Sequence, residues 1–323
     1  MTTDAGELAA ATLTDGRALA VRLAQPADAE ALLALIHRAF RARPVVGEEP
    51  EALRDDLASV RDRLEHGSGY VAVVDGAPAG VIMVAPMGTH LRLGRVCVLP
   101  EHRRAGLASF LVGVVLEHQA AMGQESVQLL ARREFPELQA WWARHGFVPV
   151  GEERNCIVMQ RAIPVVAEVP DADAMRALGR RLARVLRAGD LVIASGDLGA
   201  GKTTLAQGLG VGLEVSGPII SPTFVLSRVH PSTVGGPAFV HVDAYRLGSF
   251  AELEDMDLEA SLDEAVTLVE WGTGIAEGLA SDRLDVDIRR GMDPADETRW
   301  VFLTPIGPRW SRDAIATAAK EDA

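Results

Sequence analysis

A stretch of eight residues near the middle of the chain has the residue types and spacing needed to hold phosphate groups. It fits the pattern G-x-x-x-x-G-K-[ST] and consists of Gly196, Asp197, Leu198, Gly199, Ala200, Gly201, Lys202 and Thr203. In such a loop the backbone N–H groups surround the phosphates, and the lysine ammonium adds a compact positive charge. Among the 32 basic residues only Lys202 and Lys320 are lysines, so general basicity does not explain a lysine here. The motif predicts a nucleotide-binding site.

The segments on both sides of this motif suit the same chemistry. Asp190–Ala194 is mostly apolar and predicts a buried strand, and Thr204–Leu209 predicts a helix that leaves the loop. This order directs the loop N–H groups and the helix N-terminus towards a bound anion. The alternative is a glycine-rich turn between a strand and a helix with no ligand. Because motif and context coincide, we favour the nucleotide site.

Two further apolar segments end in an acidic residue. Ala238–Asp243 and Ala265–Glu270 each predict a strand with a carboxylate at its carboxyl end, where ligands bind in parallel sheets. Mg²⁺ prefers oxygen ligands and is held in phosphate sites by one or two carboxylates. Thr203 and the two acids are therefore candidate metal ligands, and the two acids are candidate catalytic residues together with Lys202. The sequence leaves open which acid contacts the metal directly and which orients an attacking water.

Four linked motifs in the second half of the chain resemble those of the TsaE (YjeE) ATPases. This bacterial family acts in the threonylcarbamoyl-adenosine modification of tRNA. The resemblance covers essentially all of residues 164–323. The motifs are Gly196–Thr204, Ser221–Phe224, His241–Leu247 and Val269–Gly272. They occur in the order and spacing of the family, so the resemblance is specific.

The resemblance implies the cofactors ATP and Mg²⁺ and gives the phosphate site its roles. Lys202 would hold the β- and γ-phosphates, and Thr203 would hold the metal. Thr204 would complete the ATP-binding loop that begins at Gly196. Asp243 and Glu270 would be the essential carboxylates of the ATPase.

The same resemblance implies elements around the phosphate site. Ser221, Pro222 and Thr223 would form a switch-like loop, and Trp271 would lie beside the bound nucleotide. The chain departs from the family at Met175, where many members have threonine, so the resemblance does not carry over one polar contact near the base, and the phosphate site is unaffected. The implied partner is a tRNA threonylcarbamoyl transferase complex of the TsaD/TsaB type.

The charge of the chain is unevenly distributed. The 323 residues carry a net charge of −13, and residues 164–323 hold 25 acidic and 15 basic residues, a balance of −10. An acidic domain is poorly suited to bind a phosphate backbone by itself. We therefore expect this half to reach tRNA only indirectly, through its partner.

Length, cysteines and apolar runs bear on domain number and location. A chain of 323 residues predicts about two domains. The N-terminus lacks the pattern of a signal peptide, and the longest apolar run, Leu107–Leu116, is too short to span a bilayer. Cys97 and Cys156 lie in apolar segments without metal-ligand spacing, which indicates core thiols in a reducing compartment. These features predict a cytoplasmic protein without membrane contact.

The first half contains a second anion-binding pattern. From Arg17 to Ile163 the sequence predicts a strand, two helices, three strands, a helix, a strand, a helix and a strand. Between the fourth strand and the next helix lies R-x-x-G-x-A, whose small residues let backbone amides approach a pyrophosphate. The pattern consists of Arg103, Arg104, Ala105, Gly106, Leu107 and Ala108.

With this element order, residues 17–162 resemble the GCN-five-related (GNAT) N-acetyltransferases. The resemblance implies acetyl-CoA as cofactor, with the pyrophosphate on the loop Arg103–Ala108 and the pantetheine along the strand that contains Val96 and Val98. Many members have a tyrosine, which protonates the departing thiolate, where this chain has Trp142. The sequence leaves the catalytic base open among His90, Cys97 and Glu101.

Taken together, the sequence predicts an α/β protein with a boundary at Pro164. Residues 1–163 would form a GNAT-like domain with a mixed sheet, and residues 164–323 a P-loop ATPase domain of the TsaE type with a mainly parallel sheet. Two alternatives remain at this point. One is a small-molecule P-loop kinase, although only Arg228 and Arg246 lie between Phe224 and Glu270 to serve as lid arginines. The other is a nucleotide-dependent adaptor that carries a degenerate acetyltransferase-like interaction domain.

Overall fold

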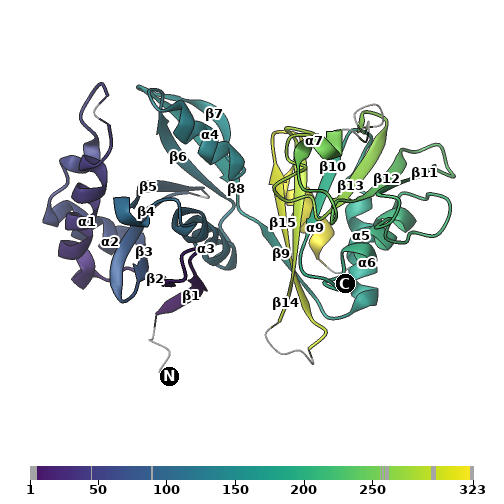
Figure 1. The fold of residues 1–323 in the computed structure, drawn as a ribbon, viewed down its shortest axis with the longest axis horizontal. Helices are drawn as coiled ribbons and strands as arrows, with labels where there is room; N and C mark the ends of the chain where they lie inside the picture. The colour runs from purple at the N-terminus through teal and green to yellow at the C-terminus, as the bar shows by residue number, and fades with distance from the viewer. Residues whose placement is uncertain are drawn as a thin grey trace. The chain divides into compact units, whose positions relative to one another are not determined.

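The computed structural model describes residues 6–320 except 45, 89, 255, 257, 259–261 and 292–295. The chain divides into two compact units, Met1–Ile163 and Pro164–Ala323 (Figure 1). Each unit is built around one sheet. Among the described residues, no helix combines the length and the apolarity that a membrane crossing requires.

The first unit contains an eight-stranded mixed sheet in the order β1-β2-β3-β4-β5-β6-β8-β7. Its strands are β1 Glu7–Thr12, β2 Ala18–Leu23, β3 Ser68–Val74, β4 Ala77–Met87, β5 His90–Val98, β6 Ser126–Arg132, β7 Val148–Glu153 and β8 Cys156–Ala162. Its α-helices are α1 Ala29–Arg41, α2 Leu57–His66, α3 Leu107–Ala121 and α4 Pro136–Arg144. Helices α1 and α2 cover one face of this sheet and α3 covers the other (Figure 1).

Strand β5 lies between β4 and β6 in this sheet. It runs parallel to β6, but their paired register extends only from His90 to Leu93 on the β5 side. Opposite β4, the register shifts between Val81 and Met83, and Arg95 has a positive φ of 50°. Because a β-bulge leaves backbone groups out of the ladder, the last residues of β5 can offer them to other partners.

Two strands of this unit were not expected from the sequence. Strand β1 is rich in alanine, which has low strand propensity, and it forms because it pairs antiparallel with β2. Strand β7 contains Pro149, Gly151 and two glutamates and lies at the sheet edge. Proline and charge are usual at edge strands, where they hinder pairing with other chains. The expected helix over residues 51–65 is a 3₁₀ turn, Glu51–Leu53, followed by α2.

The second unit contains a seven-stranded sheet in the order β11-β12-β13-β10-β14-β15-β9. Its strands are β9 Val165–Val169, β10 Leu191–Ser195, β11 Ser227–His230, β12 Ala238–Asp243, β13 Ala265–Glu270, β14 Arg283–Arg290 and β15 Arg299–Ile306. Its helices are α5 Ala172–Ala183, α6 Lys202–Gly212, α7 Phe250–Glu254 and α9 Arg312–Ala319. The four neighbouring strands from β12 to β14 are parallel, as predicted for the core of this sheet, and the outer pairs are antiparallel.

Close packing of helices fixes the helix that begins at the phosphate-binding motif. A Cβ atom on Gly179 of α5 would lie 2.5 Å from the backbone oxygen of Leu205 in α6. A Cβ atom on Gly208 would lie 2.3 Å from the backbone oxygen of Arg176. The two backbones therefore approach more closely than side chains would allow, which anchors α6 against α5. The sequence of residues 284–290 and 299–304 predicts a hairpin, and β14 and β15 confirm it by pairing antiparallel; four of the residues between them, 292–295, lie outside the described part.

Candidate functional site

The phosphate-binding motif connects β10 to α6, as predicted. Its glycines adopt positive φ angles of 134° at Gly196, 74° at Gly199 and 117° at Gly201, a region that other residues rarely adopt. At Gly196 a Cβ atom would also lie 2.3 Å from the backbone oxygen of Ile288. The loop therefore needs glycine at these positions. Of the other loop residues, Ala200 is buried and Leu198 is 82% exposed.

Lys202 is buried inside this loop, with only 4% of its surface exposed. Its ammonium donates to the backbone oxygens of Gly196 at 2.6 Å and Asp197 at 2.9 Å. Nζ also lies 3.6 Å from the ring centroid of Trp271, a cation–π contact. Burial lowers the pKa of Lys202 below its ordinary value, which the nearby charges of Glu270 and Asp243 partly oppose. The ammonium is thus held inside the loop by two backbone oxygens and the indole ring.

Glu270 connects the loop to the neighbouring strands. It is 2% exposed, and its Oε1 accepts from the Thr203 hydroxyl at 2.9 Å. The same oxygen lies 2.8 Å from Nε2 of the fully buried His241. Because a carboxylate accepts, Nε2 carries the proton, and His241 fixes the orientation of Glu270. The sequence contained His241 in its third motif, but nothing local indicated this contact.

Asp243 holds the loop that was expected to act as a switch. Its Oδ2 accepts from the hydroxyls of Ser221 at 2.8 Å and Thr223 at 2.7 Å. Its Oδ1 accepts from the backbone N–H of Tyr245 at 3.0 Å. Asp243 and Glu270 are register partners on the parallel strands β12 and β13. The structure thus brings both predicted carboxylates to one end of the sheet, each with a different set of partners.

Trp271 lies directly after β13 and borders the ammonium of Lys202. Its backbone has a positive φ of 62°, and its N–H donates to Ala194 at the end of β10 at 2.9 Å. Its ring centroid lies 5.1 Å from that of Tyr245. These contacts hold a strained conformation that turns the indole towards the loop. Thr204 lies in the first turn of α6 and is half-buried.

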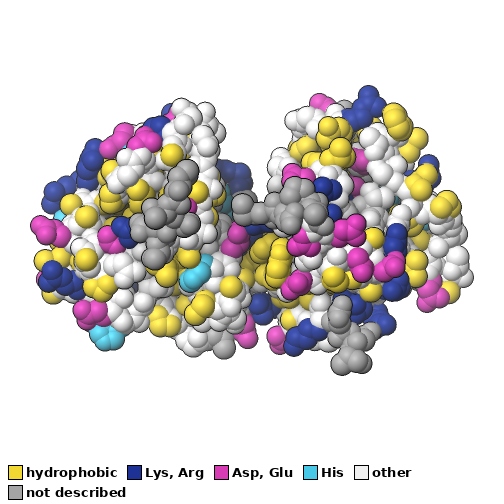
Figure 2. All heavy atoms as spheres, turned by 90° about the horizontal axis from the view of Figure 1, so that it is seen from below, with side chains coloured by type: hydrophobic (Ala, Val, Ile, Leu, Met, Phe, Trp, Pro, Cys, Tyr) yellow, Lys and Arg dark blue, Asp and Glu magenta, His cyan; other side chains and the backbone are white. Residues whose placement is uncertain are grey.

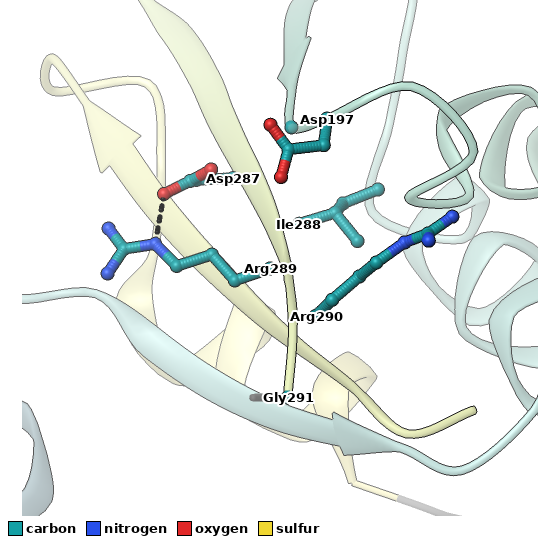
Figure 3. Close-up of a pocket in the computed structure, with 7 residues that line it drawn as sticks. Asp197, Asp287, Ile288, Arg289, Arg290 and Gly291 are labelled. Atoms are coloured by element: carbon teal, nitrogen blue, oxygen red, sulfur yellow. Dashed lines mark hydrogen bonds and ion pairs between the residues drawn. The ribbon is translucent and has the colours of Figure 1, made fainter. Parts of the chain in front are cut away.

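Arg290, at the end of β14, is a contact to the motif that the sequence did not reveal. Its Nη2 donates to the backbone oxygens of Gly199 at 2.6 Å and Leu198 at 3.3 Å. Figure 3 shows Arg290 directed towards this loop, whereas Arg289 is paired with Asp287. An open hollow of about 500 Å³ lies beside them. It is lined by Gly196, Asp197, Asp287, Ile288, Arg289, Arg290 and Gly291.

The first unit presents its loop at the start of α3. Gly106 has a positive φ of 83° at the helix N-cap, and a Cβ atom there would meet nothing within 4 Å. The helix N-terminus is therefore open to an anion. Arg103 instead donates to the backbone oxygen of Ala39 at 3.1 Å, and Arg104 is exposed with a φ of 64°. Ala105 and Leu107 are buried, and Ala108 is half-buried.

The residues considered for acid–base chemistry are engaged elsewhere. Trp142 is 3% exposed and packs on Phe147, with ring centroids 4.9 Å apart, so it belongs to the core. His90 is hydrogen-bonded to Ser126 at 2.6 Å, and Glu101 is paired with Arg38 at 2.6 Å. Burial raises the pKa of Cys97 to about 12, so its thiol is neutral at ordinary pH. Cys156 is half-buried rather than part of the core.

Comparisons with known proteins match both units. Residues 169–299 match the family model of the threonylcarbamoyl adenosine biosynthesis protein TsaE, and residues 30–147 match that of the GNAT acetyltransferases. The chain is 57% identical over 147 residues to a tRNA threonylcarbamoyladenosine biosynthesis protein TsaE of Streptomyces coelicolor, covering 45% of this chain and 99% of that protein. It is 53% identical over 121 residues to the TsaE protein of Mycobacterium leprae, covering 35% and 75%. A Thermoplasma acidophilum PaiA N-acetyltransferase structure with coenzyme A is 14% identical, covering 44% of this chain and 97% of that chain, with a TM-score of 0.41.

Proposed function

The chain belongs to the TsaE family of tRNA threonylcarbamoyladenosine biosynthesis proteins, and we propose that its residues 164–323 bind ATP with Mg²⁺ and hydrolyse it. One observation carries this proposal. The Thr203 hydroxyl of the phosphate-binding loop is hydrogen-bonded to Glu270 at the end of the adjacent parallel strand. A hydroxyl and a carboxylate at this place form the donor pair that holds magnesium in P-loop NTPases.

The residues present fit a magnesium ion. Thr203 and Glu270 offer oxygen atoms, which this cation prefers, and the remaining positions would be filled by phosphate oxygens and water. When bound, the ion neutralises charge that develops on the phosphates. His241 keeps the Glu270 carboxylate directed at Thr203, so it acts as a positioning residue. Lys202 adds the fixed positive charge of its ammonium inside the loop.

Asp243 has a different role in this proposal. Its contacts to Ser221 and Thr223 tie the switch-like loop to the strand end beside Glu270. These hydroxyls could donate to a phosphate oxygen in place of Asp243. In this proposal Asp243 would link the switch-like loop to the phosphate site and orient the attacking water, and Glu270 would hold the metal. Trp271 encloses the phosphate site next to Lys202.

The partner we propose is the TsaD/TsaB-type tRNA threonylcarbamoyl transferase complex, which this unit would serve in the cytoplasm. Leu198, Phe224 and Tyr245 are 82%, 91% and 61% exposed beside the nucleotide site. Exposed aromatic and apolar side chains at a functional site are typical of protein–protein contacts. Figure 2 shows acidic and basic side chains interspersed on the face that it draws. Together with the balance of −10, this supports contact with tRNA through the partner.

Nucleotide affinity should fall as the pH rises on the alkaline side. The pKa of Lys202 lies below its ordinary value of 10.5, so the ammonium of the free protein loses its proton earlier than an exposed lysine. Phosphates favour the charged form, and binding then takes up one proton, so Kd should rise by up to about tenfold per pH unit above that pKa. Fluorescence titrations with methylanthraniloyl-ADP between about pH 7 and pH 10 measure this. If Kd of Lys202→Ala rose with pH as steeply as Kd of the wild type, this prediction would be contradicted.

For residues 1–163 we propose acetyl-CoA as cofactor, because the open N-terminus of α3 suits a pyrophosphate. Val96 and Val98 of β5 would border the pantetheine beyond the last residue paired with β6. The acetyl group would pass directly to an amine, with binding and positioning as the main contribution of the protein. This is the same class of chemistry that the family match indicates.

Coenzyme A binding should depend on Gly106. Gly106→Glu should weaken binding by at least about tenfold, because the added carboxylate repels phosphate at the helix N-terminus. Gly123→Glu is the matched control: Gly123 follows the other end of α3, has a φ of 76° and also has open space around its Cβ position. Calorimetry on the full chain measures both variants. Equal losses would assign the effect to backbone strain, and no binding by the wild type at millimolar ligand would refute acetyl-CoA as cofactor.

A further inference from the structure

Arg43, which follows α1, carries a charge without an acidic partner. Its Nη2 donates to the backbone oxygen of Val96 in β5 at 3.0 Å, and its guanidinium lies 4.0 Å above the Phe40 ring. Both partners are uncharged. Within the described part of the chain, no carboxylate lies at ion-pair distance from Arg43. Burial lowers its pKa.

The charges around Arg43 are themselves positive. Arg103 and Arg132 act on it, and both disfavour its charged form. Arg132 forms an ion pair with Glu134 at 2.9 Å. The charge of Arg95 is neutralised by Asp55, whose two carboxylate oxygens both accept from it. Three arginines with one carboxylate leave this end of β5 positively charged. A partly buried guanidinium in such surroundings is costly unless an anion compensates it.

Arg43 lies on the other face of β5 from α3, although the side chain of Arg103, the first residue of the proposed coenzyme loop, acts on it. Cys97 and Leu99 pack into the core under α1 and α2, on the face from which Arg43 comes. Val96 and Val98 pack against the core on the α3 face, where the coenzyme loop begins the helix. The guanidinium therefore reaches β5 from the side opposite α3, beyond the point where β5 and β6 stop pairing. A second substrate approaching from the α1–α2 side would meet it.

We propose that Arg43 binds an anionic group of the acetyl acceptor, so that the acceptor is an amine carrying a carboxylate, such as an amino acid or the end of a short acidic peptide. This inference rests on the proposed acetyl transfer. In that reaction the amine nitrogen bonds to the acetyl carbon, the carbon–sulfur bond breaks, and one amine proton ends on the thiol of coenzyme A. Arg43 holds the acceptor and takes no part in proton transfer. A polyamine or a basic peptide would be repelled.

The same positive charge could bind a phosphate of coenzyme A instead of a carboxylate of the acceptor, so the test must separate these two anions. The probes are coenzyme A conjugates in which an acetyl bridge joins the sulfur to an amine. Three matched pairs are used: glycine and glycinamide, β-alanine and β-alaninamide, and 4-aminobutyrate and its amide. Each pair differs only in the carboxylate. Calorimetry on the full chain gives Kd for each conjugate and for coenzyme A alone.

For the wild type we expect at least one acid conjugate to bind about tenfold or more tightly than its amide. In Arg43→Gln this preference should disappear, while coenzyme A itself binds as before. Arg43→Lys should keep part of the preference, since lysine retains the positive charge but lacks the paired N–H donors with which a guanidinium binds both oxygens of a carboxylate. Arg61→Gln removes an exposed arginine of α2 and should change nothing. Circular dichroism checks that every variant is folded.

Three results would overturn the inference. Equal binding of acid and amide in all pairs would show that no anion of the acceptor is bound. An equal loss for coenzyme A and all conjugates in Arg43→Gln would assign the charge to a coenzyme phosphate. Retention of the preference in Arg43→Gln would assign it to another residue. Failure of coenzyme A alone to bind the wild type would instead refute the proposed cofactor, and the inference with it.

Discussion

Replacing Lys202 by alanine should reduce ATP hydrolysis by the full chain to the background rate, a loss of at least about a hundredfold. The Lys202 ammonium donates to the backbone oxygens of Gly196 and Asp197, the first two residues of the loop. Glu270→Ala should also reduce hydrolysis greatly, because it removes the carboxylate that Thr203 and His241 contact. Phosphate release from ATP with Mg²⁺, at equal protein concentration, measures both effects.

The other lysine of the chain provides the matched control for this experiment. Lys320 is exposed at the end of α9, and Lys320→Ala removes the same charge far along the sequence from the loop. This variant should hydrolyse ATP like the wild type. Hydrolysis at the wild-type rate in both Lys202→Ala and Glu270→Ala would refute the assignment. Nucleotide binding by the wild type without any hydrolysis would favour the adaptor interpretation instead.

Reconstituted tRNA modification should stop after about one round per transferase complex when this protein is omitted. We propose that ATP hydrolysis resets the TsaD/TsaB-type complex between turnovers, and a resetting step is needed only for repeated cycles. Lys202→Ala should behave like omission, because it leaves the partner surface at Leu198 and Phe224 in place but removes the phosphate contact. The measurement is the amount of threonylcarbamoyl-adenosine formed per complex over time.

The amplitude of the first round serves as the internal control. It should be the same with and without this protein, because transfer itself is assigned to the partner complex. Lys320→Ala should support repeated rounds. Undiminished multiple turnover in the absence of the protein would refute the resetting role. A first round that also fails would place the protein in the transfer step.

Local sequence patterns were sufficient for the elements that carry the phosphate chemistry. The loop at Gly196 and the two strands that end in Asp243 and Glu270 have the predicted order and positions. They could be predicted because a buried strand is a short apolar run, because a loop with positive φ angles requires glycine, and because phosphate binding calls for a lysine at the helix start. The parallel core of the second sheet followed from the alternation of strands and helices.

The contacts that tune these sites were decided only by tertiary structure. His241 reaches Glu270 across 29 positions, Arg290 reaches Gly199 across 91, and Arg43 reaches Val96 across 53. No local pattern encodes such pairs, since each depends on strand order and on how two elements pack. Trp142 likewise became a core residue because Phe147 packs against it. Sequence determines which chemistry the chain can offer, and packing over long separations determines which side chains are held in place to perform it.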